Sequence, residues 1–197
     1  MGMANVDISQ FSGFYAVLMQ YVFVLAAVYA AHLGSSAVSR ESVDKTYEFL
    51  FTKPRSRSFI LSHKLLAALV YLTLYACLSL LFSVLAVRQL ALEVDYFELY
   101  LRYAVVMWAL ELVFFSIAAM FAASMRVSER GARAGNLAVL FTYALAVAYD
   151  LLEKPGLLRL LTPFRYFFFF FLLDSGMQHF YLFLVFSLCV LFLVFEF

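Results

Sequence analysis

Charged residues are scarce in this sequence, which has 14 Lys and Arg and 13 Asp and Glu among 197 residues. Charged side chains make up 14% of the chain and hydrophobic ones 66%, whereas ordinary soluble domains are about 25% charged and about 45–50% apolar. So few charges cannot cover a water-facing surface, and the composition therefore excludes a soluble globular fold. The net charge of +1 provides no overall field that attracts nucleic acid, and we expect no nucleic-acid partner.

The sequence also lacks the motifs of common enzymes and metal sites. It has no phosphate-binding loop, zinc-protease motif, nucleophile elbow or dinucleotide loop, so the chain itself is not expected to hydrolyse ATP or to hold a cofactor. Its two cysteines, Cys77 and Cys189, lie in apolar runs without a C-x-x-C spacing, and we interpret them as packing residues. No metal site is predicted, because the three histidines are far apart in the sequence: His32, His63 and His179.

Long apolar runs dominate what is present. A helix needs about 20 residues to cross the hydrocarbon core of a bilayer, and the runs are continuous rather than alternating, which favours helices over barrel strands. The sequence predicts an all-α integral membrane protein whose residues 1–197 form one transmembrane domain with five crossings. Residues 164–173 are too few to cross and are predicted to form a re-entrant or interfacial segment before the last span. The predicted spans are residues 11–33, 65–87, 103–125, 134–152 and 180–197.

The connectors between these runs predict the orientation. Residues 34–64 and 126–133 lie on the same side of the membrane and hold nine of the 14 basic residues. Because cytoplasmic loops are enriched in Lys and Arg, both connectors are predicted to be cytoplasmic and the N-terminus to be outside. The nine residues are Arg40, Lys45, Lys53, Arg55, Arg57, Lys64, Arg126, Arg130 and Arg133.

The first cytoplasmic connector is longer than a simple helix-to-helix turn, which needs about two to eight residues. Its residues 41–52 have an apolar stripe at helical spacing, and Pro54 ends the pattern. The helix could lie on the lipid surface, with Lys53, Arg55 and Arg57 on anionic headgroups. Its acidic residues favour a basic protein groove instead. The stripe is Val43, Tyr47, Leu50 and Phe51, and the acidic residues are Glu41, Asp44 and Glu48.

This connector resembles the first cytoplasmic loop of the permeases of type-2 ATP-binding-cassette (ABC) exporters. That family has a Gly near the end of one span, an acidic residue, a Thr-x-Glu-x-Leu core, Lys-Pro-x-x-Arg and a Lys at the start of the next span. The matching residues are Gly34, Glu41, Thr46, Glu48, Leu50, Lys53, Pro54, Arg57 and Lys64. The family usually has six crossings, so the resemblance implies that this chain lacks the first crossing and a tail after the last.

The resemblance also implies a function. The chain would be the membrane-spanning subunit of an ABC transporter in the cell membrane, exporting a substrate as a homo- or heterodimer with a second permease subunit. A separate subunit would bind ATP and Mg²⁺ and receive the connector as a coupling helix. The implied contact residues are Glu41, Val43, Lys45, Thr46, Tyr47, Glu48, Leu50, Phe51, Lys53 and Arg57, with a secondary contact at Arg126, Glu129 and Arg130.

Glu111 is the exception inside a predicted span. An ionised carboxylate there costs about 2.5–3.5 kcal/mol, so Glu111 must face protein or water rather than lipid. Two roles stay open: a pore or substrate contact, and a packing role between helices. An alternative function, an intramembrane enzyme acting on lipid through Glu111, Asp150 or Asp174, is weakened because these carboxylates have no paired partner in the sequence. A membrane scaffold that only recruits a partner is a third alternative.

Overall fold

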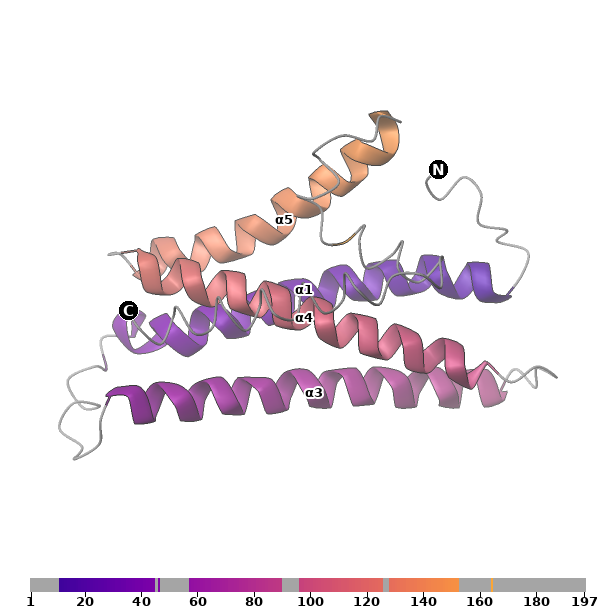
Figure 1. Ribbon diagram of the computed structural model, residues 1–197, viewed down its shortest axis with the longest axis horizontal. Helices are drawn as coiled ribbons and strands as arrows, with labels where there is room; N and C mark the ends of the chain where they lie inside the picture. Colours follow the sequence, from indigo (N-terminus) through magenta and orange to yellow (C-terminus); the bar gives the residue numbers. More distant parts are fainter. Residues whose placement is uncertain are drawn as a thin grey trace, which may run out of the picture.

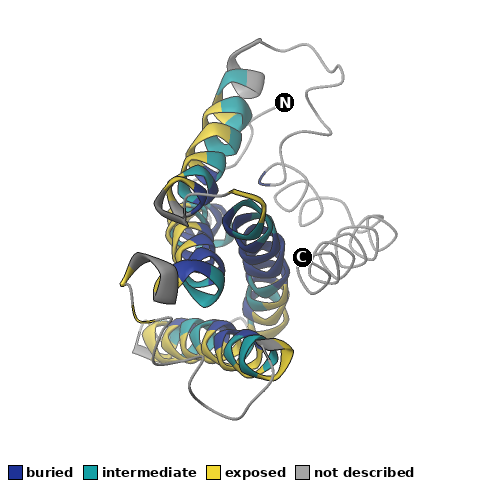
Figure 2. Cartoon of the chain, turned by 90° about the vertical axis from the view of Figure 1, so that its left-hand side faces the viewer, coloured by how far each residue is buried: buried dark blue, intermediate teal, exposed yellow. Residues whose placement is uncertain are grey.

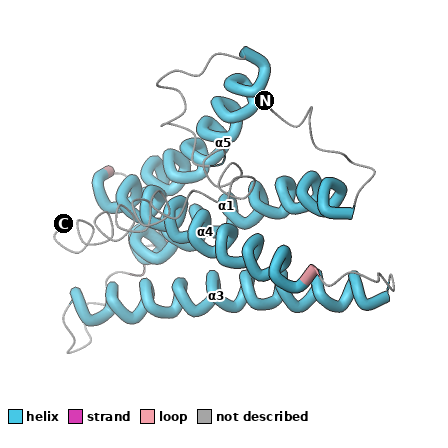
Figure 3. Tube along the Cα trace, turned by 45° about the vertical axis from the view of Figure 1, so that its right-hand side comes forward, coloured by secondary structure: helices cyan, strands magenta, loops and turns pink. Residues whose placement is uncertain are grey.

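The structure is a computed structural model that describes residues 11–44, 46, 57–89, 96–125, 128–152 and 164. Every regular element in these ranges is an α-helix (Figure 3). The helices are α1 (Phe11–Val43), α3 (Arg57–Gln89), α4 (Phe97–Ser124) and α5 (Ser128–Leu152). The predicted all-α class is therefore confirmed for the described part of the chain.

Three of these helices are long and apolar enough to cross a membrane. Their membrane-capable stretches are Phe11–Arg40, Ser58–Arg88 and Phe97–Ser124, while the apolar part of α5 is the shorter Arg133–Ala148. The first three predicted spans thus coincide with membrane-capable helices. The count of five crossings is not confirmed, since α5 falls short and residues 180–197 lie outside the described residues. The predicted segment 164–173 is described only at Phe164.

The helices alternate in direction. α1 and α4 run toward one end of the molecule, and α3 and α5 run back from it (Figure 1). The end of α1 and the start of α3 therefore lie at the same end as the junction between α4 and α5. The helix ends that flank the two basic connectors emerge together, as the sequence predicts for connectors on the same side of a membrane.

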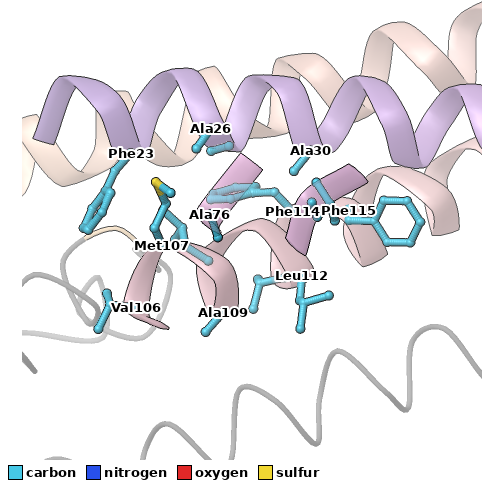
Figure 4. Packing of buried hydrophobic residues seen from close by; sticks show 14 of the residues in the cluster. Phe23, Ala26, Ala30, Ala76, Val106, Met107, Ala109, Leu112, Phe114 and Phe115 are labelled. Carbon is cyan, nitrogen blue, oxygen red and sulfur yellow. The ribbon is translucent and has the colours of Figure 1, made fainter. Parts of the chain in front are cut away.

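Small residues bring α1 and α4 into close contact. Ala26 and Ala30 are fully buried on α1, and Figure 4 shows them facing Met107 and Phe114 of α4. At Gly34 an added Cβ would collide with the carbonyl group of Phe115. Because lipid is as apolar as these side chains, close packing of small residues is what favours helix association in a membrane. The α1–α4 contact is the densest part of the described core.

Glycines serve the same purpose between α5 and α4. The sequence pattern predicts that residues 131–135 permit close helix approach, with Gly131 more simply explained as a loop turn. Gly131 instead lies inside α5, where an added Cβ would be 2.8 Å from the Cα of Ala122. One turn later, a Cβ on Gly135 would be 2.8 Å from the Cβ of Ala118. Both glycines therefore pack α5 against α4.

α3 has a different environment. It packs against α4 and more slightly against α1, and its outer side is exposed along the helix, as the yellow face of the lowest helix in Figure 2 shows. At the end where α4 begins, α1 and α3 are joined by a hydrogen bond in which the Tyr15 hydroxyl donates to Ser83 Oγ over 2.9 Å. The exposed large side chains include Leu66, Val70, Tyr71, Leu74, Leu78, Leu81, Phe82 and Leu85.

Candidate functional site

The first residues of the predicted coupling helix are part of α1. α1 continues past the predicted end of the span at Leu33 through Val43, so Glu41 and Val43 belong to the last turn of α1. The sequence predicts the end of the span at Leu33, but the next residue, Gly34, is a helix-packing position against Phe115. The helix predicted for residues 41–52 is therefore not confirmed.

Internal hydrogen bonds explain why this polar end of α1 stays helical. Ser39 Oγ donates to the Ser35 carbonyl oxygen over 2.7 Å, so the hydroxyl needs no water or partner helix. The Asp44 N–H donates to the Arg40 carbonyl oxygen over 2.8 Å, and their side chains form an exposed ion pair of 3.5 Å. These contacts stabilise the helix up to its last residue, Val43, and the turn at Asp44 that follows.

The other predicted contact residues are only partly described. Thr46 is exposed and not helical. Arg57 is the first residue of α3. Glu129 and Arg130 lie in the first turn of α5, and Arg130 is exposed. The remaining residues lie outside the described part of the chain: Lys45, Tyr47, Glu48, Leu50, Phe51, Lys53 and Arg126.

Glu111 lies at the middle of α4 and is fully buried, with a relative exposure of 0%. Neither carboxylate oxygen has a hydrogen-bond partner among the described residues. The side chain faces protein, as the cost of placing it in lipid predicts. Tyr75 on α3 lies within electrostatic range of this carboxylate, and its ring stacks on Tyr29 of α1 with centroids 5.6 Å apart and planes at 30°.

Sequence reasoning missed both tyrosines. Tyr29 and Tyr75 lie in long apolar runs, where a tyrosine has the same appearance as any aromatic residue that faces lipid or fills the core. Their spacing within their own helices carries no signal, because the stacked pair forms between two separate helices. Only the pairing of α1 with α3 brings the two rings together.

A comparison with known families decides what kind of protein carries these features. The model of the ABC-2 family transporter protein matches residues 2–184, which is most of the chain. The chain belongs to the ABC-2 transporter family. No curated protein and no solved structure matches it.

Membership of the ABC-2 family confirms the resemblance found in the first connector. An ABC-2 permease is a membrane transport subunit rather than an enzyme, and it normally works with an ATP-binding subunit. The membrane-capable helices agree with an integral membrane protein. The described structure also adds no pair of carboxylates to the lipid-enzyme alternative, since neither Glu111 oxygen has a partner there and the Asp150 side chain and Asp174 lie outside it.

The described ranges of the ABC-2 chain contain other side chains of the types that bind metal ions. No group of three His, Cys, Asp or Glu side chains there has a spacing that would hold a metal ion. Cys77 is exposed and unpaired, whereas Cys189 lies outside the described residues. The candidate functional sites are therefore the connector after α1 and the buried carboxylate of Glu111.

Proposed function

We propose that this chain is the permease of an ABC exporter in the cell membrane and that it couples ATP hydrolysis by a separate subunit to substrate movement. The observation that carries the proposal is the ABC-2 family match over residues 2–184. A second permease subunit, identical or different, completes the translocation unit. ATP and Mg²⁺ bind to the partner subunit, while the permease supplies the path through the membrane.

The connector between α1 and α3 transmits the motion in this proposal. α1 is one continuous helix from Phe11 to Val43, with a close backbone contact to α4 at Gly34. A displacement applied at Val43 is therefore carried along one helix into the core. Closure of two ATP-binding subunits would move the connectors docked on them, and rigid helices would pass this motion into the bilayer.

Two substitutions test the coupling role, one in the connector and one in the last turn of α1 that leads into it. Leu50→Asp places an unpaired charge in the proposed apolar contact, where the desolvation cost is several kcal/mol. Glu41→Arg reverses a charge that a basic groove would attract. We expect either variant to lose ATPase-subunit binding, measured by co-purification in detergent, and to lose transport while the chain stays inserted in the membrane.

The matched control is Glu98→Arg, the same charge reversal in the first turn of α4 at the opposite end of the helices. This variant should bind the ATPase subunit like the wild type. Unchanged or tighter binding by Glu41→Arg would instead support a connector that lies on anionic lipid, because the added cation would strengthen that contact. Failure of the wild-type chain to co-purify with any ATPase that has a Walker A motif would contradict the proposed function itself.

A further inference from the structure

The two sides of α5 have different surroundings. Gly131 and Gly135 lie one turn apart on the side that packs against α4, where an added Cβ would be 2.8 Å from an α4 atom at both positions. Val139, a further turn along the same side, is fully buried. Residues three or four positions apart share one side of a helix, so these three residues define the packed side. α5 lies at the edge of the described helices (Figure 1), and its opposite side is exposed.

The exposed side of α5 joins two arginines to a row of large apolar residues. Arg130 and Arg133 are exposed in the first two turns of the helix. Leu137 is four positions after Arg133 and therefore lies on the same side. The exposed large apolar residues of α5 are Leu137, Leu140, Phe141 and Val147. This side of α5 thus presents cations near its start and apolar side chains along the rest.

The order of these residues matches the order of chemical groups in one lipid leaflet. The apolar stretch of α5 begins at Arg133 and ends at Ala148. With a rise of 1.5 Å per residue, Leu137 and Phe141 lie about 6 and 12 Å along the helix from Arg133. One leaflet of the hydrocarbon core is about 15 Å thick. Both residues therefore lie at the depth of acyl chains when the arginines lie at the depth of phosphate groups.

The neighbouring helices differ from α5 at the same end of the molecule. On α1, the exposed Arg40 forms an ion pair of 3.5 Å with Asp44, which offsets its charge. On α3, the exposed large apolar residues nearest that end are Phe59, Leu66 and Val70, which suit acyl chains and carry no charge. Among the described residues, α5 is therefore the helix that combines a pair of exposed guanidinium groups with an exposed apolar side.

An anionic phospholipid matches both parts of this surface. A guanidinium group binds phosphate oxygens through two parallel hydrogen bonds, and the apolar row is at the depth of acyl chains. An acidic protein segment would match the arginines but not the apolar row. An anionic lipid is favoured over a zwitterionic one, because the cation in a zwitterionic headgroup offsets the charge of its phosphate.

We propose that the exposed side of α5 binds an anionic phospholipid of the leaflet that adjoins the start of this helix. Arg130 and Arg133 hold the phosphate group, and Leu137, Leu140 and Phe141 contact an acyl chain. The site requires only the permease and does not depend on the proposed coupling to ATP hydrolysis. It assigns Arg130 to lipid, whereas the family resemblance implies a contact with the ATPase subunit.

Quenching of a single tryptophan by brominated lipids tests which lipid contacts α5. Trp108, the one tryptophan of the chain, is replaced by Phe, and Phe141→Trp places the reporter on the proposed site in lipid vesicles. Comparing dibrominated phosphatidylglycerol with dibrominated phosphatidylcholine gives the ratio of their binding constants. We expect phosphatidylglycerol to be favoured about fivefold, because two arginines and Glu129 leave one net positive charge in the first two turns.

The matched control is Val70→Trp on the same Trp108→Phe background. Val70 is as many residues from the start of α3 as Phe141 is from the start of α5, and the two residues are 61% and 64% exposed. The reporter on α3 should show a ratio of about one. On the α5 reporter, Arg130→Gln combined with Arg133→Gln should also lower the ratio to about one. The corresponding pair of Lys substitutions keeps both charges and should retain the preference within about twofold.

The lipid site is wrong if the reporters on α5 and α3 show the same ratio, or if the pair of Gln substitutions keeps the preference. If the Trp108→Phe background does not fold, native mass spectrometry compares the phosphatidylglycerol retained by the wild type and by the Gln pair with Trp108 intact. Equal retention would then overturn the site. Loss of ATPase-subunit binding by the Gln pair with an unchanged lipid preference would assign the arginines to a protein contact instead. Failure of the wild type to bind any ATPase, with the lipid preference intact, would overturn only the proposed function.

Discussion

α4 and α3 are two helices of similar length and apolarity with opposite surroundings. In the most apolar stretch of α4, 67% of the residues are buried inside the protein, against 22% in α3. α4 lies between α1, α3 and α5, whereas α3 borders the group and exposes one long side. Apolarity therefore brings a helix into the membrane but does not decide whether it faces protein or lipid.

The difference follows from the residues that approach each helix. α4 is contacted through small residues of its neighbours, at Gly34 of α1 and at Gly131 and Gly135 of α5. Such residues let backbones come close and gain van der Waals contact that lipid cannot match. α3 presents large residues such as Leu74 and Phe82 outward, and lipid chains can accommodate these equally well. Small residues on the neighbouring helices α1 and α5 thus explain why α4 is the central helix.

Of the substitutions that test this difference, Gly34→Leu should lower the stability of the helix bundle most. A side chain at position 34 would overlap the backbone of Phe115, and backbone cannot move aside as a flexible side chain can. We expect a loss of at least about 3 kcal/mol in the free energy of unfolding, seen as aggregation or loss of the monodisperse peak in size-exclusion chromatography. The control is Ala67→Leu on the exposed side of α3, which should elute like the wild type. Equal behaviour of the two variants would contradict the close α1–α4 contact.

Phe115→Ala and Phe82→Ala compare the two helices directly. Phe115 on α4 is 0% exposed, and Phe82 on α3 is 66% exposed. Removing the buried ring leaves a cavity and should cost about 3 kcal/mol. Removing the exposed ring should change stability by less than about 0.5 kcal/mol, because lipid replaces it. Denaturant titration in detergent measures both, and similar losses would show that α3 is as enclosed as α4.

The Tyr15 hydroxyl provides a smaller test of how α3 is held. It donates to Ser83 Oγ, which itself donates to the Ser79 carbonyl oxygen over 2.8 Å. Tyr15→Phe should lower the free energy of unfolding by about 1 kcal/mol, which is within the range of hydrogen bonds between membrane helices. A double-mutant cycle with Ser83→Ala isolates the contact. Additive effects of the two substitutions would mean that this bond does not join α1 to α3.

The hydrogen bond between Trp108 and Thr73 should contribute least to the free energy of unfolding. It is partly exposed and long at 3.2 Å, so Thr73→Val should lower the free energy of unfolding by about 0.6 kcal/mol. Thr142→Val is a suitable control, since Thr142 Oγ1 bonds only to carbonyl oxygens of its own helix in the described contacts. If Thr73→Val lowered the free energy of unfolding more than Tyr15→Phe does, the expected order of these two contacts of α3 would be wrong.

Part of the candidate site could be predicted from individual residues. A carboxylate at the middle of an apolar run must avoid lipid, so the burial of Glu111 followed from its position alone. The Lys-Pro-x-x-Arg pattern and its neighbours pointed to the ABC-2 family, which the family match confirms. The Tyr29–Tyr75 stack could not be predicted in the same way, because it joins two helices whose rings lie far apart in the sequence.

The sequence by itself determined that this protein consists of membrane helices and that its basic connectors share one end. Long apolar runs must satisfy their backbone hydrogen bonds internally in lipid, which requires helices, and successive crossings alternate in direction. The tertiary structure alone decided which helix is central, that Gly34 is a packing position inside α1, and that Tyr29 of α1 stacks on Tyr75 of α3. The physical reason is that lipid and protein interior are almost equally apolar, so shape complementarity between distant residues, rather than hydrophobicity, selects the contacts.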